Sequence, residues 1–275
     1  MALAKIIFKS VLLVFTIAAG AGIFAAAADK KYQPEVLTAL LEKVQSARAA
    51  GKKPIVIFDL DETLLNSRIR ALRILKDIAF RQDISEGFPS EADQIMRMGY
   101  SDIRAWIMDL PEILSRAGIQ NPRFTERIEN LYADAYLSNK FCALDWVEPG
   151  AVQYVKKLSG LGAHIAYLTG RNRPGMSVCT EEALRKNGFP LGASENASLT
   201  MKSKRALDDA EFKKKALASI AQLGQVVGGF DNEPANVNAL KEAFPDALIV
   251  FLDTMHSNRP DQPGNNIPWI KDFQN

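Results

Sequence analysis

Two aspartates, Asp59 and Asp61, stand one residue apart directly after an uninterrupted apolar run at residues 55–58. Such a run is typical of a strand that is buried on both faces of a parallel sheet. Ligands of open α/β sheets bind beyond the carboxyl ends of the strands, so both aspartates are predicted to lie where chemistry occurs. Carboxylate and carbonyl oxygens at this spacing favour Mg²⁺ and also supply a nucleophile with an acid–base neighbour.

A second predicted strand, at residues 165–168, is followed by Thr169, Gly170 and Arg171. A hydroxyl group beside the unhindered backbone of a glycine is well suited to bind a phosphoryl oxygen. The guanidinium group of Arg171 has two interpretations: a bidentate contact to phosphate or substrate, or an ion pair with a carboxylate of the helical insertion described below. These residues add candidate phosphate-binding groups to the two aspartates.

The string DLDETL, from Asp59 to Leu64, resembles the first motif of the haloacid dehalogenase-like (HAD) hydrolase superfamily. The resemblance extends over about residues 52–255. It implies that Asp59 attacks phosphorus and forms an aspartyl-phosphate intermediate. It further implies that Asp61 protonates the leaving oxygen and then deprotonates the hydrolytic water, while Thr169 and a lysine bind the transferring phosphoryl group.

The resemblance also implies a Mg²⁺ cofactor, held by Asp59, the backbone carbonyl of Asp61, and Asp231. Asp231 follows a predicted strand at residues 226–230 and matches the acidic residue of the fourth family motif. The next residue is Asn232, where many family members have a second aspartate. With one negative charge fewer, this site should bind metal somewhat more weakly.

The third family motif is a lysine near the start of the helix before that strand, and Lys213, Lys214 and Lys215 are the candidates. The chemistry needs one ammonium group that faces the nucleophile, neutralises phosphoryl charge and keeps Asp59 ionised. At least two of the three lysines must therefore lie on a solvated helix face. Lys213 is our choice because it directly follows the apolar Phe212, as in the family's pattern, and Lys214 is the reserve.

The acid at position 61 indicates the reaction class. Dehalogenases of the family lack it because a halide leaving group needs no proton, whereas the alkoxide of a phosphoryl ester does. A phosphomutase would find little substrate outside the cytoplasm. We therefore expect a phosphomonoester hydrolase that acts on a small phosphorylated metabolite, either a nucleotide or a sugar phosphate. The alternative is a non-catalytic binding protein of the same fold in the cell envelope, which only Asn232 favours.

Around these motifs, predicted strands alternate with predicted helices, which indicates a parallel sheet covered on both faces. The expected class is α/β, with a Rossmann-like sheet of about five strands and the first strand in its centre. A helix is predicted to open at Pro34 and to end before Gly51, and another is predicted to be capped by Asp208 or Asp209. The predicted strands are residues 55–58, 165–168, 197–201, 226–230 and 247–252.

Residues 66–144 interrupt this alternation with apolar residues at helical spacing, cut by glycines and prolines. We expect them to form an α-helical cap inserted into an α/β core of residues 29–65 and 145–275. Caps close over small molecules and exclude water, which favours a metabolite over a protein as the substrate.

Residues 1–28 have the pattern of a secretory signal peptide: a basic start, an apolar middle and small residues at the end. Cleavage near Ala27 or Ala28 predicts an exported, periplasmic protein. The alternative is a membrane anchor formed by residues 6–28, because the apolar run approaches the ~20 residues that span a bilayer. Its second half is rich in alanine and glycine and therefore weakly hydrophobic, which favours cleavage.

The formal net charge of +2 gives no electrostatic case for nucleic acid as a partner. The two cysteines, Cys142 and Cys179, could pair in an oxidising compartment. Sequence alone does not bring their Cα atoms within bonding distance, and we favour two buried free thiols.

Overall fold

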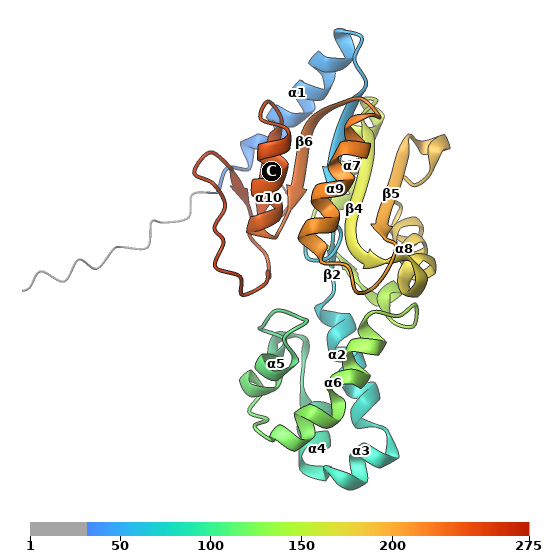
Figure 1. Cartoon of the computed structure of the whole chain (residues 1–275), viewed down its shortest axis with the longest axis vertical. Coiled ribbons are helices and arrows are strands. Elements are labelled where there is room, and N and C mark those ends of the chain that lie inside the picture. Colours follow the sequence, from blue (N-terminus) through green and yellow to red (C-terminus); the bar gives the residue numbers. More distant parts are fainter. Residues whose placement is uncertain (1–31, 275) are drawn as a thin grey trace, which may run out of the picture. The chain divides into compact units, whose positions relative to one another are not determined.

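The computed structural model describes residues 32–274, so the signal peptide or anchor predicted within residues 1–28 lies outside the described residues. A six-stranded sheet with the order β5-β4-β1-β6-β7-β8 forms the centre of the α/β part, in the upper half of Figure 1. Neighbouring strands are parallel, and β1 lies in the interior of the sheet, as expected. The strands are β1 (Pro54–Phe58), β4 (His164–Asn172), β5 (Ala197–Lys202), β6 (Gln225–Asp231), β7 (Leu248–Leu252) and β8 (Trp269–Ile270).

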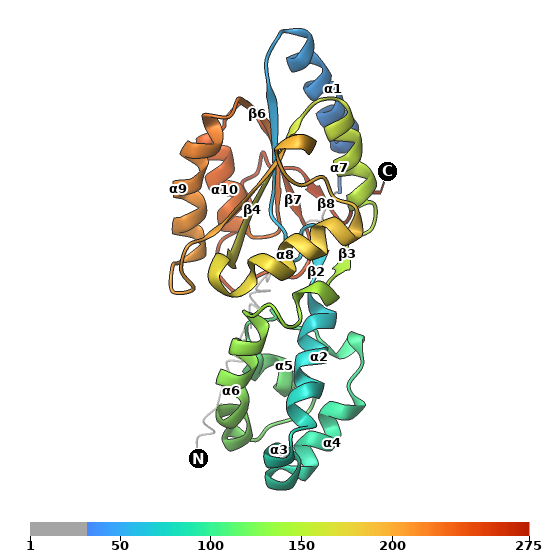
Figure 2. The same ribbon diagram turned by 90° about the vertical axis from the view of Figure 1, so that its right-hand side faces the viewer.

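Helices cover both faces of this sheet (Figure 2). On one face lie α1 (Glu35–Ala49), α7 (Ala151–Gly160) and α8 (Arg173–Asn187), and on the other lie α9 (Asp209–Ala221) and α10 (Pro234–Ala243). Successive side chains of a strand point to opposite faces. Val56 and Phe58 therefore pack into the first layer, and Ile55 and Ile57 into the second. Burial on both faces explains why β1 reads as a continuous apolar run.

Local signals set the helix ends that position the site. Helix α1 begins directly after Pro34 and ends before Gly51, whose φ of +72° lies in the left-handed region that favours glycine. Helix α9 begins directly after its N-cap residue Asp208, whose side chain accepts a hydrogen bond from the backbone N–H of Glu211. Helix α8 begins directly after its N-cap residue Asn172, whose side-chain oxygen accepts a hydrogen bond from the backbone N–H of Gly175. The predicted cap of α9 is therefore Asp208 rather than Asp209.

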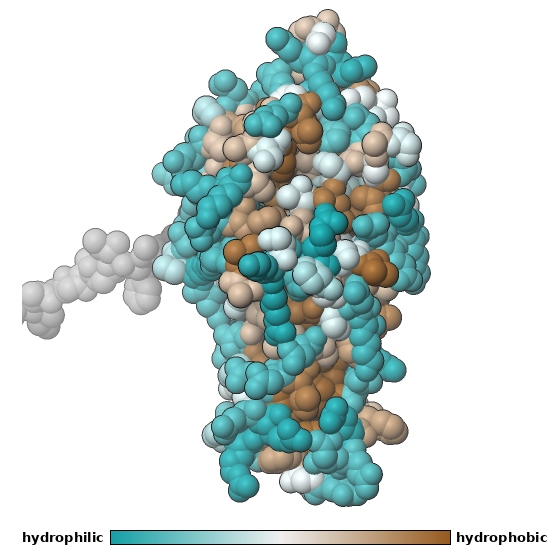
Figure 3. All heavy atoms as spheres, turned by 45° about the vertical axis from the view of Figure 1, so that its right-hand side comes forward, coloured by the Kyte–Doolittle hydropathy of each residue, from teal (hydrophilic) through white to brown (hydrophobic). Residues whose placement is uncertain are grey.

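A helical segment lies within residues 66–144, and we call it the cap. It consists of α2 (Arg68–Ala79), α3 (Gln82–Gly87), α4 (Pro89–Arg97), α5 (Leu110–Arg116) and α6 (Pro122–Tyr136). These helices have a hydrophobic core of their own, which includes the fully buried Ile74, Ile95 and Ile128. The short antiparallel strands β2 (Leu65–Asn66) and β3 (Trp146–Val147) join its two connections to the α/β core. In addition to this buried core, hydrophobic side chains gather on the face of the cap that Figure 3 shows.

The sheet has one strand more than the five predicted. Strand β8 contributes two residues, which pair with Phe251 and Leu252 of β7. A two-residue strand is too short to produce the alternation by which strands are found in a sequence. Within residues 32–274, no helix is long and apolar enough to cross a membrane.

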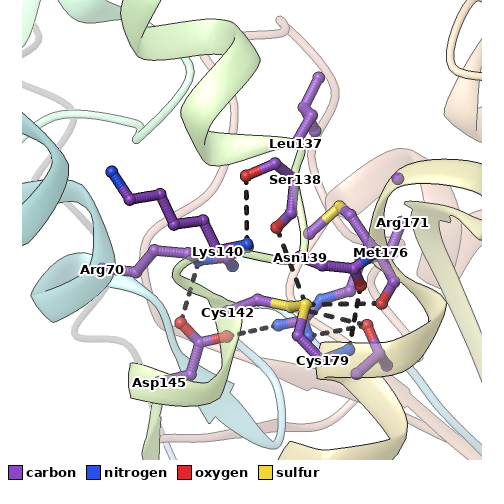
Figure 4. The surroundings of a disulfide bond; sticks show 12 residues. Arg70, Leu137, Ser138, Asn139, Lys140, Cys142, Asp145, Arg171, Met176 and Cys179 are labelled. Atoms are coloured by element: carbon purple, nitrogen blue, oxygen red, sulfur yellow. Dashed lines mark hydrogen bonds and ion pairs between the residues drawn. A yellow bond between two sulfur atoms is a disulfide. The ribbon is translucent and has the colours of Figure 1, made fainter.

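Cys142 and Cys179 form a disulfide, with their Cα atoms 5.6 Å apart (Figure 4). The expectation of two free thiols is therefore wrong. Cys142 lies in a short turn after the cap helix α6, and Cys179 lies in α8 of the α/β core. The chain brings them together only where the cap returns to the core, a tertiary contact that cysteine spacing does not show.

The disulfide should contribute to stability because it closes a loop between residues 37 positions apart in the sequence. Replacing both Cys142 and Cys179 by alanine is expected to lower the free energy of unfolding by about 3 kcal/mol. Urea unfolding followed by circular dichroism measures this difference. A reducing agent should destabilise the natural sequence and leave the double variant unchanged; equal effects on both would contradict the assignment.

Candidate active site

Three adjacent strands bring the sequence-predicted residues to one edge of the sheet. Phe58 is in register with Phe230 of β6 and with Tyr167 of β4, so the residues that follow them lie side by side. The backbone N–H of Asp59 continues this ladder by donating to the carbonyl of Phe230 at 3.0 Å. Asp59 and Asp231 thereby emerge from neighbouring strands at the carboxyl edge.

One ammonium group binds both of these carboxylates. Lys213 Nζ donates to Asp59 Oδ1 at 2.6 Å and to Asp231 Oδ2 at 2.7 Å. Helix α9 buries this side chain, while it exposes Lys214 and Lys215, the latter paired with Glu211. Of the three candidate lysines, Lys213 is therefore the one that contacts Asp59.

Burial and the neighbouring charges oppose each other at Asp59. Burial raises the pKa of its carboxyl, the Lys213 ammonium lowers it, and the Asp231 carboxylate raises it again, to about 8 in all. Burial alone would lower the pKa of Lys213, but Asp231 and Asp59 raise it well above its usual range. The lysine thus stays charged, and one further positive charge nearby would favour the ionised form of Asp59.

Other polar groups fix Asp231 and its neighbour. Asp231 Oδ1 accepts hydrogen bonds from the backbone N–H of Glu233 at 2.9 Å and from Asn236 Nδ2 at 3.0 Å. The amide of Asn232 donates to the carbonyl of Met255 at 2.6 Å, and its oxygen accepts from the hydroxyl of Thr63 at 3.2 Å. Asn232 therefore ties the loop after β7 to the site.

The side chain of Asp61 is held by two arginines. Arg171 Nε and Nη2 each donate to it at 2.8 Å, and Nη2 of Arg70, in the first turn of α2, donates to Asp61 Oδ1. Asp145 joins both arginines: its carboxylate lies 2.6 Å from Arg171 Nη2 and 3.0 Å from Arg70 Nε (Figure 4). Each arginine pairs with Asp61 and with Asp145, and both guanidinium groups are buried.

This arrangement sets the charge of Asp61. Burial alone would raise the pKa of its carboxyl, but the guanidinium groups of Arg171 and Arg70 lower it below its usual range. Asp61 is therefore ionised. Of the two interpretations offered for Arg171, the structure shows ion pairing, although its partners are Asp61 and Asp145 rather than a carboxylate from within the helices of the cap.

Thr169 and Gly170 lie at the same edge of β4. The hydroxyl of Thr169 is buried and accepts a hydrogen bond from the backbone N–H of Arg171 at 3.2 Å. Gly170 borders the cavity described next, and a side chain at its position would collide with the carboxylate of Asp209. The glycine thus allows the start of α9 to approach β4 closely.

A cavity of about 370 Å³ lies between the cap and the carboxyl edge of the sheet. Its floor includes Asp59, Asp61 and Lys213, and cap residues Trp106 and Met108 form an apolar part of its wall. The volume suits a small molecule. Of the predicted site residues, Asp59, Asp61, Gly170, Arg171 and Lys213 border this space. Thr169 and Asp231 are buried behind it and do not line the cavity.

The oxygen-rich edge fits a Mg²⁺ ion in its donor chemistry. Among residues 32–274, no group of three or more His, Cys, Asp and Glu side chains is placed to hold a metal. Two carboxylates, of Asp59 and Asp231, nevertheless converge on one ammonium, and the backbone of Asp61 is next to them. Hard oxygen donors of this number, completed by water and substrate phosphate, are what Mg²⁺ takes in proteins.

Sequence reasoning missed Arg70, Asp145 and Glu62. The first two lie in or beside the cap, and their burial depends on how the cap returns to the core, which no local pattern shows. Glu62 is part of the first motif but was given no role. One of its oxygens accepts hydrogen bonds from the backbone N–H and hydroxyl of Ser67, and the other has no hydrogen-bond partner. Its φ of +56° is unusual for a residue other than glycine.

No family model matches this chain, and no curated protein matches it by sequence. Solved structures do match it. Protein tyrosine kinase A from Mycobacterium tuberculosis superposes with a TM-score of 0.51 and 18% identity, covering 79% of this chain and 93% of that chain. A HAD-superfamily hydrolase from Ehrlichia chaffeensis gives 0.43 and 14%, covering 80% of this chain and 91% of that chain.

CbbY from Rhodobacter sphaeroides, solved in complex with xylulose-(1,5)bisphosphate, gives a TM-score of 0.45 and 14% identity, covering 81% of this chain and 95% of that chain. Identities at this level show the fold alone. The α/β fold with a parallel sheet and flanking helices, expected from the sequence, is confirmed.

Removing the shared ammonium group should destabilise the site. Lys213→Met leaves Asp59 and Asp231 buried with no cation between them, and is expected to lower the free energy of unfolding by about 3 kcal/mol. The exposed neighbour provides a matched control, because Lys214→Met should change it by less than about 0.5 kcal/mol. Urea unfolding in EDTA measures both, and equal losses would contradict the assignment of Lys213.

Proposed function

We propose that this chain is an exported, Mg²⁺-dependent phosphomonoester hydrolase of the HAD-like superfamily, acting on a small phosphorylated metabolite. The observation that carries the proposal is the convergence of Asp59 and Asp231 on the ammonium of Lys213, at the carboxyl edge of the sheet and beneath a cavity. A nucleophilic carboxylate, oxygen donors for a cation and a charge for the phosphoryl group are thus together in one place.

In the proposed reaction, Asp59 attacks phosphorus, and the bond between phosphorus and the ester oxygen breaks. Lys213 lowers the pKa of Asp59, and a bound Mg²⁺ would supply the further positive charge that ionises this carboxyl. The ammonium also offsets the charge that develops on the phosphoryl oxygens. Water then attacks the phosphorus of the aspartyl-phosphate and regenerates Asp59. Mg²⁺ would be held by Asp59, Asp231 and the backbone carbonyl of Asp61, and would neutralise phosphoryl charge when bound.

Asp61 is the proposed acid and base of the two steps. Its ionised state suits the second step, in which it takes a proton from the attacking water. To protonate the leaving oxygen in the first step, Asp61 must carry a proton, which comes from solvent in the first turnover and from the attacking water of the preceding turnover thereafter. Holding this proton requires its pairs with Arg70 and Arg171 to loosen when the substrate enters. The phosphoryl dianion supplies a competing partner for the guanidinium groups.

Export is proposed from the N-terminal pattern, and the disulfide supports it. Disulfides persist in oxidising compartments such as the periplasm and are rare in the cytosol. Cys142 and Cys179 are paired, and no free cysteine is left in the chain. An uncleaved anchor at residues 6–28 would change the location of the enzyme without changing its chemistry.

Phosphate release tests this proposal. Protein lacking residues 1–28 should release inorganic phosphate from a panel of phosphomonoesters in Mg²⁺, and EDTA should abolish the release. Asp59→Asn removes the nucleophile at nearly constant volume and should lower kcat by at least about 10³-fold. Asp77→Asn, at an exposed aspartate of α2, is the matched control and should leave kcat unchanged.

Two results would contradict the proposal. Release that persists in Asp59→Asn would exclude this residue as the nucleophile. Folded, Mg²⁺-loaded protein that releases phosphate from no ester, yet binds esters in calorimetry, would instead indicate the non-catalytic binding protein.

A further inference from the structure

The charged groups around the cavity are unequal in number. Its lining includes six carboxylates, those of Asp59, Asp61, Glu62, Asp208, Asp209 and Glu233. It includes four cations, those of Arg171, Lys202, Lys213 and Arg259. Carboxyl groups therefore outnumber cations in this lining.

Every one of these cations already has a carboxylate partner. Lys213 and Arg171 are paired as described above. Lys202 pairs with Asp209 and also donates to the carbonyl of Leu207 at 2.9 Å. Arg259, at the half-exposed rim, lies 3.3 Å from Asp208. A second anionic group on a substrate would therefore have to displace an existing ion pair, because no cation of this lining is without a carboxylate partner.

One carboxylate oxygen, by contrast, is without a partner. Both oxygens of Glu233 accept bonds from Ser257, at 2.8 and 2.6 Å. In Glu62, Oε1 accepts from Ser67 at 2.7 and 2.8 Å, but the buried Oε2 accepts none. A buried acceptor without a donor is costly, and a ligand that supplies the donor relieves that cost.

We propose that Glu62 is a specificity residue, and that the natural ester has a leaving group with a hydrogen-bond donor for Glu62 and no second anionic group. This inference rests on the proposed function. The donor is an ammonium or a hydroxyl group on the carbons next to the ester oxygen, because Glu62 follows Asp61, the residue proposed to meet that oxygen. Amino-alcohol and polyol monophosphates have this chemistry, whereas bisphosphates and phosphorylated carboxylic acids do not.

Four esters in two matched pairs test the inference. Phosphoethanolamine and phosphoglycolate have the same length and differ in an ammonium or a carboxylate. Glycerol 3-phosphate and 3-phosphoglycerate differ in a hydroxymethyl group or a carboxylate. In Mg²⁺, kcat/KM should be at least about tenfold higher for the first member of each pair, which corresponds to about 1.4 kcal/mol. The two pairs separate an ammonium donor from a hydroxyl donor.

Glu62→Gln identifies the residue responsible. The ratio of kcat/KM for phosphoethanolamine to that for phosphoglycolate should fall about tenfold in this variant. The ratio does not depend on the concentration of active enzyme, so partial unfolding cannot imitate the effect. Glu148→Gln is the matched control, because Glu148 is a buried carboxylate near Glu62 that does not border the cavity, and the ratio should stay unchanged.

Equal rates within both pairs, a preference for the anionic members, or an unchanged ratio in Glu62→Gln would overturn the inference while leaving the phosphatase proposal intact. If the natural sequence hydrolyses none of the esters, the proposed function fails instead. Calorimetry with Asp59→Asn protein then still decides the specificity: tighter binding of the first member of each pair supports it, and equal binding overturns it.

Discussion

The rest of the site depends on one buried ammonium group that is shared by two carboxylates. Asp59 follows β1, Asp231 ends β6, and Lys213 comes from α9, so three elements must be in register for the contacts at 2.6 and 2.7 Å to form. Two aspartates at this depth would repel each other without the lysine. The same balance leaves room for one more cation, so the proposed nucleophile, phosphate partner and metal site all depend on this arrangement.

A second group of charges ties the cap to this centre. Arg70 lies in the first helix of the cap, Asp145 directly follows the cap in the sequence, and Arg171 belongs to the α/β core. All three side chains are buried around Asp61. The disulfide between Cys142 and Cys179 links the last turn of the cap segment covalently to α8. Removing one partner would leave a buried charge unpaired, which costs about 3–5 kcal/mol. The position of the Asp61 side chain therefore depends on how the cap packs against the α/β core.

The sequence was sufficient where a feature is local. Strand patterns indicate an apolar strand that stops at Asp59 and a second that stops at Asp231. The choice of Lys213 came from a resemblance to a family motif, and the structure places these three side chains in contact. The sequence was insufficient where a contact forms between segments that are far apart in the chain, such as the end of the cap and the α/β core. The disulfide, the pairing of Arg70 with Asp145, and the two-residue strand β8 have no periodicity of their own, and the free oxygen of Glu62 is visible only once its surroundings are known.

We propose that Asp59 becomes covalently phosphorylated during turnover. Rapid acid quenching of the Mg²⁺-loaded protein with an ester that it hydrolyses, followed by mass spectrometry of its peptides, tests this most directly. We expect a phosphoryl group on the peptide that contains Asp59, appearing before steady-state release and absent from Asp59→Asn protein. Phosphate release with the phosphoryl group on another residue, or release by Asp59→Asn at an undiminished rate, would contradict it.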